Sequence, residues 1–143
     1  MTRINVRVYA LILNDKKEIL ISEENRHGKS FTKFPGGGLE WGEGIKECLV
    51  RELEEELGLK AMIGDLFYVN EFFQESAFAK NNQMISFYYS ITSIDFQSIE
   101  VVEDDLPIQE NEERFRWVSL DKISEESFTF PIDKEVGKRL ANP

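Results

Sequence analysis

The sequence has very little cysteine or histidine, the residues that supply most disulfide and zinc chemistry. Cys48 is the only cysteine and His27 the only histidine among 143 residues. A single cysteine excludes an intramolecular disulfide and predicts a reducing compartment. A histidine with no second histidine or cysteine nearby is a poor candidate for a metal site. We interpret Cys48 as a small buried helix residue rather than a reactive thiol.

Long apolar runs and basic stretches are also missing. No segment approaches the roughly 20 apolar residues of a membrane span, and the first eight residues lack a signal-peptide pattern. The net charge of −10, with no basic stretch to offset it, argues against nucleic-acid binding but not against nucleotides, because metal ions can bridge acidic groups and phosphates. We therefore expect a cytoplasmic protein made of one domain over residues 1–143.

The most informative residues of the sequence lie between Gly37 and Leu59, a segment rich in glycine and glutamate. The second half of this segment predicts a helix from about Ile45 to Leu57, because apolar residues recur at helical spacing and Gly58 is placed to cap the C-terminus. The apolar positions are Ile45, Cys48, Leu49 and Leu53.

Glutamates crowd the last turns of this helix, at the end where the macrodipole disfavours anions. At about 100° per residue, Glu52 and Glu56 lie roughly 20° either side of Ile45, on the apolar face. Glu55 lies at the edge of that face. The outer face carries Glu47, Arg51 and Glu54.

The inward carboxylates need a partner, because a carboxylate that faces the protein body otherwise loses its charge. The basic residues of the helix, Lys46 and Arg51, are too few and wrongly placed to balance Glu52, Glu55 and Glu56. A hard divalent cation such as Mg²⁺, Mn²⁺ or Ca²⁺ would balance these carboxylates, since such ions prefer oxygen ligands.

The first half of the segment is rich in glycine, with a turn at residues 35–38 and further glycines at Gly42 and Gly44. Glycine lets backbone groups approach a ligand closely, and the N-terminus of a helix favours phosphate. No Gly-Lys-Ser/Thr follows, so the turn is not a P-loop. A glycine turn followed by metal-suited carboxylates predicts chemistry on a phosphate-containing substrate.

The spacing of these residues resembles the Nudix box, with every specified position filled. The matching positions are Gly37, Glu43, Arg51, Glu52, Glu55, Glu56, Gly58 and the apolar residues around them. The flanking Phe34–Gly36 and Arg116–Leu120 also resemble the usual surroundings of the box. The resemblance implies a Nudix hydrolase, which uses Mg²⁺ or Mn²⁺ to cleave a nucleoside diphosphate linked to another group X.

The resemblance also implies roles for individual residues. Glu52 and Glu56 are the expected metal ligands, on their angle as well as on the motif, and Glu55 is a ligand or the base. The backbone carbonyl of Gly36 is expected to be a further ligand. From the acidic segment 98–113, Glu112 or Glu113 is expected to add a carboxylate, and we favour Glu112.

Two residues of the box are expected to support it without binding substrate. Arg51, one turn from Glu55, is expected to hold that carboxylate in orientation, and Glu43 to hydrogen-bond to the box from the loop side. Trp41, among the glycines, is expected to pack locally rather than to stack on a base.

The box leaves other functions and the substrate open. A catalytically silent nucleotide-binding sensor of the same fold is the alternative, and a calcium-binding or structural protein is a weaker one. Group X could be that of a nucleoside triphosphate, ADP-ribose, a nucleotide sugar or a dinucleoside polyphosphate. The expected partner is a small-molecule nucleotide, with no nucleic acid and no membrane, and a homodimer is left open.

The remaining pattern predicts strands around the helix. A central first strand at residues 4–13 is expected to pair with residues 18–22. Residues 24–33 are expected to form a polar loop, with a short strand at 31–34 leading into the glycine turn, and residues 60–73 to form a hairpin with 84–92. A last strand at 115–118, a short helix capped by Ser119 and a final helix from Pro131 to Leu140 follow. This order predicts an α/β protein, a three-layer α/β/α sandwich with a mixed central sheet, and the Nudix resemblance implies the same fold.

Overall fold

A computed structural model describes residues 1–93, 99–104 and 106–143, in which the chain divides into two compact units. The first unit comprises Met1–Leu11 and Pro35–Ser98, and the second comprises Ile12–Phe34 and Ile99–Pro143. Residues 94–98 and Asp105, which include part of the acidic segment 98–113, lie outside the described residues. In the described part of the chain, no helix has the length and apolar composition of a membrane span.

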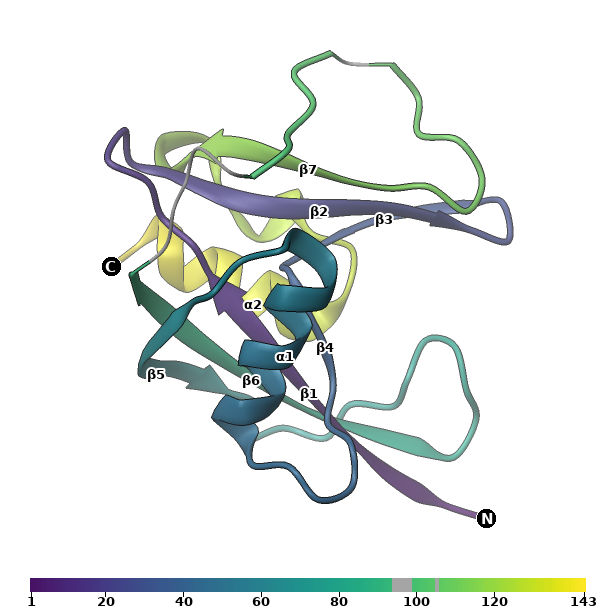
Figure 1. Cartoon of the computed structure of the whole chain (residues 1–143). Coiled ribbons are helices and arrows are strands. Elements are labelled where there is room, and N and C mark those ends of the chain that lie inside the picture. Colours follow the sequence, from purple (N-terminus) through teal and green to yellow (C-terminus); the bar gives the residue numbers. More distant parts are fainter. Residues whose placement is uncertain (94–98, 105) are drawn as a thin grey trace. The chain divides into compact units, whose positions relative to one another are not determined.

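The first unit contains a mixed four-stranded sheet and one helix (Figure 1). Its elements are β1 (Arg3–Leu11), β4 (Gly36–Gly38), α1 (Ile45–Leu57), β5 (Met62–Val69) and β6 (Asn82–Ser93). The strand order is β4-β1-β6-β5, with β1 parallel to β6 and antiparallel to β4, and β5 antiparallel to β6. The predictions of a central first strand and of a pairing between the strands now labelled β5 and β6 are confirmed.

Helix α1 has the predicted bounds, because both of its ends are defined locally. Gly58 adopts a left-handed conformation (φ 64°) and donates its N–H to the Glu54 carbonyl at 3.0 Å. At the other end, the Glu47 carboxylate accepts the N–H of Gly44 at 3.0 Å. Between these ends the helix packs against β1, β4 and β5.

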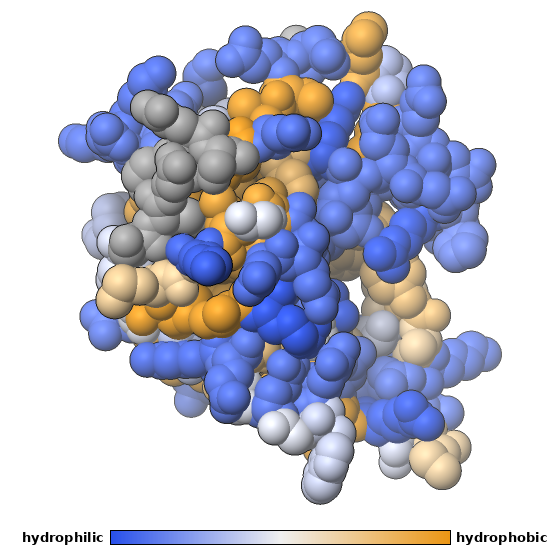
Figure 2. Space-filling view, viewed as in Figure 1, coloured by the Kyte–Doolittle hydropathy of each residue, from blue (hydrophilic) through white to orange (hydrophobic). Residues whose placement is uncertain are grey.

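The direction in which α1 faces is also as predicted. Its buried residues are Cys48, Leu49 and Leu53. Glu52 and Glu56 are half-buried beside them, whereas Glu54 is exposed. Hydrophilic residues cover most of the face on which α1 lies (Figure 2).

The second unit contains an antiparallel three-stranded sheet, two 3₁₀ turns and one helix. Its elements are β2 (Glu18–Arg26), β3 (Lys29–Lys33), β7 (Glu113–Ser119), η2 (Leu120–Lys122), η3 (Glu125–Ser127) and α2 (Pro131–Ala141). The strand order is β3-β2-β7. Ser119 caps η2 by accepting the N–H of Asp121, and Pro131 opens α2, both as predicted.

Two predictions for the second unit are wrong. Strand β2 pairs with β3 and β7 rather than with β1, and the chain after β1 adds only the isolated bridge between Leu13 and Ile19. The loop predicted at residues 24–33 is mostly strand, since β2 extends to Arg26 and β3 begins at Lys29, with a tight turn at His27 and Gly28. The short strand predicted at residues 31–34 overlaps β3.

Residues 24–33 were predicted as a loop because they are polar, but their charged side chains include a buried, paired group. Glu24 and Lys33 are only 5% and 6% exposed, and the Lys33 ammonium lies 3.1 Å from the Glu24 carboxylate. Glu113 of β7 lies 3.7 Å from the same ammonium and accepts a hydrogen bond from Ser22. Burial alone would raise the pKa of Glu24, but Lys33 and the hydrogen bond with Glu113 outweigh burial and lower that pKa. The charges are paired across strands, so a polar run that is typical of a loop is compatible with a buried sheet.

Replacement of Gly58 tests the cap of α1. Gly58→Ala should lower the free energy of unfolding by about 1 kcal/mol, because a Cβ is disfavoured in the left-handed region even though no atom lies within 4 Å of its position. Gly58→Asn, which tolerates this conformation better, should lose less. Urea unfolding of the three proteins measures the difference, and equal stability of Gly58→Ala and the parent would contradict the assignment of the cap.

Candidate active site

The glycine turn brings backbone close to the helix. Gly36 has φ 147°, and a Cβ there would overlap the Val8 carbonyl of the neighbouring strand β1. A Cβ on Gly37 would overlap the carboxylate of Glu52. Both positions therefore require glycine, and the absence of side chains lets the Glu52 carboxylate lie against the backbone of β4.

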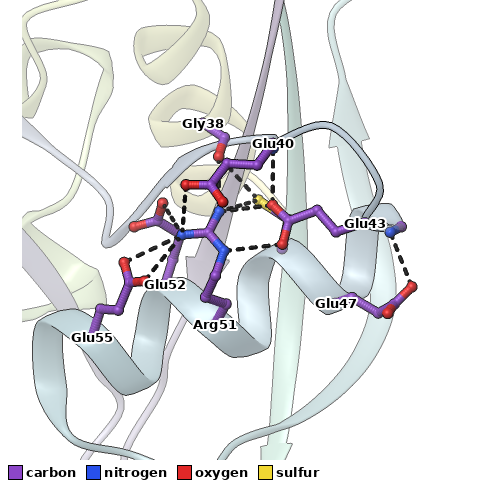
Figure 3. A network of polar contacts seen from close by, with 9 residues as sticks. Gly38, Glu40, Glu43, Glu47, Arg51, Glu52 and Glu55 are labelled. Atoms are coloured by element: carbon purple, nitrogen blue, oxygen red, sulfur yellow. Dashed lines mark hydrogen bonds and ion pairs between the residues drawn. The ribbon is translucent and has the colours of Figure 1, made fainter.

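A single arginine gathers the carboxylates around this turn (Figure 3). The Nε and Nη2 groups of Arg51 donate to the two oxygens of Glu43 at 2.9 and 2.7 Å, a two-pronged contact that suits the guanidinium fork. Nη1 donates to Glu52 at 3.1 Å and to Glu55 at 3.2 Å, and Nη2 also donates to the Gly38 carbonyl at 3.1 Å.

The prediction that Arg51 lies on the outer face, wrongly placed for the inner glutamates, is wrong, although its single charge still cannot balance all of these carboxylates. Its side chain is 24% exposed and reaches both the loop and the inner carboxylates. The helical angle describes where a side chain leaves the backbone, whereas the long arginine side chain ends one turn away, beside Glu43 and Glu52. The expected contact between Arg51 and Glu55 is present, and so is the expected support from Glu43.

The ionisation of these groups follows from the same contacts. The Arg51 hydrogen bonds, with the N–H of Glu40, lower the pKa of Glu43 to about 2. Glu43 and the other carboxylates raise the pKa of Arg51, against the effect of its burial. Burial, followed by the effect of Glu43, raises the pKa of Cys48 to about 12. Cys48 is therefore the inert buried residue predicted from the sequence.

The donors around the turn suit a hard divalent cation. Glu52 and Glu56 are half-buried carboxylates on one face of α1, Glu55 is an exposed carboxylate beside them, and Gly36 offers a backbone carbonyl in β4. All of these are oxygen donors, the type that Mg²⁺ and Mn²⁺ prefer. Within the described residues, no three acidic, histidine or cysteine side chains already form a ligand group. Glu52 and Glu55 accept hydrogen bonds from Arg51, so a cation bound by them would have to compete with that arginine.

Two other predicted residues, Glu112 and Trp41, are exposed. Glu112 is an exposed residue of the second unit, where its carboxylate accepts the N–H of Gln109, so its role as a ligand stays a prediction. Trp41 is fully exposed, which contradicts the expected local packing. Most of the other residues in the connection from β4 to α1 are glycine or glutamate, so little apolar surface of this loop lies beside the ring.

The chain matches the NUDIX domain family over residues 3–140. It belongs to that family. The predicted Nudix resemblance is thus confirmed, and the match extends far beyond the box. A solved MutT Nudix hydrolase from Burkholderia pseudomallei shares the fold, with a TM-score of 0.70 and 22% identity over 97% of this chain and 98% of that chain. The predicted α/β fold with a mixed sheet is confirmed with it.

Two curated relatives are similar to parts of this Nudix chain. An ADP-ribose pyrophosphatase from Methanocaldococcus jannaschii is 40% identical over 63 residues, which cover 41% of this chain and 37% of the relative. An 8-oxo-dGTP diphosphatase from Escherichia coli is 35% identical over 69 residues, which cover 47% of this chain and 53% of the relative. The aligned segments span about half of each relative or less, and the activities named are those of the relatives. The expectation of a Nudix hydrolase agrees with both names.

The low pKa of Glu43 predicts how its contribution to stability depends on pH. A depressed pKa stabilises the fold above the ordinary value of 4.5, and this contribution disappears as pH falls toward about 2. Glu43→Gln should therefore be less stable than the parent near neutral pH, with a gap that narrows from about pH 4.5 to about pH 3. Urea unfolding across that range measures the gap.

The control for this prediction is Glu54→Gln, which removes one carboxylate from the exposed face of α1 without touching Arg51. If the stability of Glu43→Gln stayed equally far below that of the parent at every pH, the pair with Arg51 would not be the source of the effect.

Proposed function

We propose that this protein is a divalent-metal-dependent hydrolase of a diphosphate bond in a nucleoside diphosphate linked to X. The observation that carries the proposal is the placement of Glu52 and Glu56 on the inner face of α1, with the Glu52 carboxylate against the side-chain-free Gly37. Membership of the NUDIX family and the names of the two relatives support the same reaction class.

In this proposal Glu52, Glu56 and the Gly36 carbonyl would hold Mg²⁺ or Mn²⁺. Glu112 remains a further ligand expected from the sequence. Glu55 is either a further ligand or the base that takes a proton from the attacking water. When bound, the cation would neutralise the diphosphate and lower the pKa of a coordinated water.

The surrounding residues position these carboxylates. Nη1 of Arg51 donates to both Glu52 and Glu55, and its Nε and Nη2 donate to Glu43. Arg51 therefore fixes the positions of these three carboxylates relative to one another. The depressed pKa of Glu43 keeps that carboxylate charged at working pH, which keeps the fork engaged. Positioning and charge stabilisation supply most of the rate in phosphoryl displacement, so such a scaffold suits the reaction.

The net charge bears on the class of substrate, and the single cysteine bears on the cellular location. A net charge of −10 fits a small nucleotide met through a cation better than a nucleic acid. The single buried cysteine fits a cytoplasmic location.

A substrate screen with Mg²⁺ and Mn²⁺ tests the function. It includes nucleoside triphosphates, ADP-ribose, nucleotide sugars and dinucleoside polyphosphates, and the products are identified. Binding of nucleotides without any metal-dependent cleavage would instead favour the silent sensor.

The first variant that tests the site is Glu56→Gln. It keeps the shape of the side chain but removes one ligand charge, so turnover should fall by about 100-fold or more, the scale of losing a charge-stabilising group. Far-ultraviolet circular dichroism should show the fold retained. Turnover close to that of the parent at saturating Mg²⁺ would end the assignment of Glu56 as a ligand.

The second test measures cation binding without catalysis. A cation that binds only the folded state stabilises it by about 2.7 kcal/mol at roughly a hundredfold excess over its Kd. The Tm should therefore rise with Mg²⁺ or Mn²⁺, and much less with NaCl of equal ionic strength, which only screens charge. Differential scanning fluorimetry measures the shift.

Matched variants locate the cation in the same experiment. Glu52→Gln should shrink the metal-induced shift, and the exposed Glu54→Gln should leave it intact. The reverse result, in which Glu54→Gln abolishes the shift and Glu52→Gln keeps it, would place the cation on the other face of α1 and refute the site.

A further inference from the structure

A second arginine, Arg7, lies beside the glycine turn but is bound very differently from Arg51. It occupies the middle of β1, the central strand, opposite Gly38 in β4 and Ser86 in β6. A Cβ added to Gly38 would lie 3.2 Å from Nη1 of Arg7. The guanidinium therefore extends over the position where Gly38 has no side chain.

Aromatic residues hold this guanidinium in a defined orientation. Nε of Arg7 donates to the Tyr9 hydroxyl at 3.1 Å, and the guanidinium carbon lies 5.7 Å from the centre of the Tyr9 ring. Tyr9 is itself fixed, because it is 8% exposed and stacks on the buried Tyr88 with ring centres 5.2 Å apart. Such support removes much of the entropy cost of ordering a long side chain on binding.

The two arginines differ in what their terminal nitrogens contact. Those of Arg51 are occupied by carboxylates and a carbonyl. Among the described residues, the hydrogen bond to Tyr9 is the one that the structure records for the Arg7 guanidinium, and it uses Nε. The terminal nitrogens of Arg7, which form the outer edge of the fork, therefore have no protein acceptor in the described part of the chain.

Arg7 also interacts electrostatically with two of the proposed metal ligands, Glu52 and Glu56. Burial would lower the pKa of Arg7, but Tyr9, Glu52 and Glu56 outweigh burial and raise it. No ion pair joins Arg7 to either glutamate within the described residues. A half-buried cation thus interacts electrostatically with two half-buried carboxylates to which it makes no ion pair in the described part of the chain.

We propose that Arg7 binds a phosphate of the substrate through its terminal nitrogens, with Tyr9 as the residue that positions it. The inference rests on the proposed function and adds a positively charged group that would contact the diphosphate. A planar guanidinium matches two oxygens of a phosphoryl group, and a fixed positive charge stabilises the charge that develops on those oxygens.

This assignment has a consequence for selectivity. Because Arg7 would contact the phosphate alone, its loss should weaken every diphosphate substrate by a similar factor, whatever the base or group X. A purely structural role, as a counter-charge for Glu52 and Glu56, would instead change stability and leave substrate affinity unchanged.

The test uses α,β-methylene-ADP, a diphosphate whose bridging carbon prevents hydrolysis, with calorimetric titration in the presence of Mg²⁺. Arg7→Gln should weaken its binding on the order of 10- to 100-fold, the scale of lost charge-assisted hydrogen bonds. Mn²⁺ binding measured alone should be unchanged or tighter, since a positive charge is removed from near the carboxylates.

Three further variants separate the alternatives. Arg7→Lys keeps the charge without the fork and should recover part of the affinity. Tyr9→Phe keeps the ring and removes the hydroxyl acceptor, so it should raise KM with a smaller change in kcat. Arg3→Gln removes the same charge from an exposed position on the same strand and should bind the probe as the parent does.

The outcomes distinguish this inference from the proposed function. If the parent binds the probe and Arg7→Gln, folded by circular dichroism, binds it within about twofold, the inference is overturned while the function stands. If the parent binds the probe through Arg7 but hydrolyses nothing in the substrate screen, the phosphate contact stands and the hydrolase proposal fails. If the parent binds no diphosphate, both are overturned.

Discussion

The structure of the first unit depends on how one guanidinium is divided among several carboxylates. Arg51 carries a single charge, and Glu43, Glu52 and Glu55 all accept hydrogen bonds from it. Glu52 and Glu55 lie in the last turns of α1, where the macrodipole disfavours anions, and Glu43 lies in the loop before the helix. The arginine offsets only part of this negative charge, so the fold retains an excess that a cation can satisfy. Stability and affinity for metal are therefore opposed in this segment.

Missing side chains are as important to the site as the charged ones. Gly36 and Gly37 let α1, β1 and β4 approach so closely that a methyl group would overlap the Val8 carbonyl or the Glu52 carboxylate. Gly38 provides the space beside Arg7 in the same way. Three consecutive glycines thus bring two arginines and the inner carboxylates to the backbone of one short strand.

Features defined by local periodicity were predictable from the sequence. The bounds of α1, the cap at Gly58, the burial of Cys48 and the outward direction of Glu54 all follow from helical spacing and backbone preference. The contacts of the site were less predictable. A helical angle locates a Cβ, but the tip of Arg51 lies where Glu43 of the preceding loop draws it.

Long-range pairing and buried charge account for the remaining errors. Nothing in residues 18–22 distinguishes β1 from β7 as a partner, because any apolar strand can satisfy their hydrogen bonds. Glu24 and Lys33 are typical of a loop until the other strand is known, since each is compatible with burial only through its contact with the other. The place of Glu112 could not be predicted either, because a loop carboxylate has no fixed spacing from the box.

The parallel pairing of β1 with β6 has a consequence for the order in which the chain can fold. Arg3 lies opposite Asn82, so the central pair of the first sheet joins residues 79 positions apart. Parallel strands gain nothing until the intervening loop is closed, and the entropy of that closure is lost before any contact is made. During synthesis β1 must remain without its β6 neighbour until most of the chain has emerged. Strand β1, an inner strand of this sheet, is thus among the first segments to be translated and among the last to pair with its native neighbours.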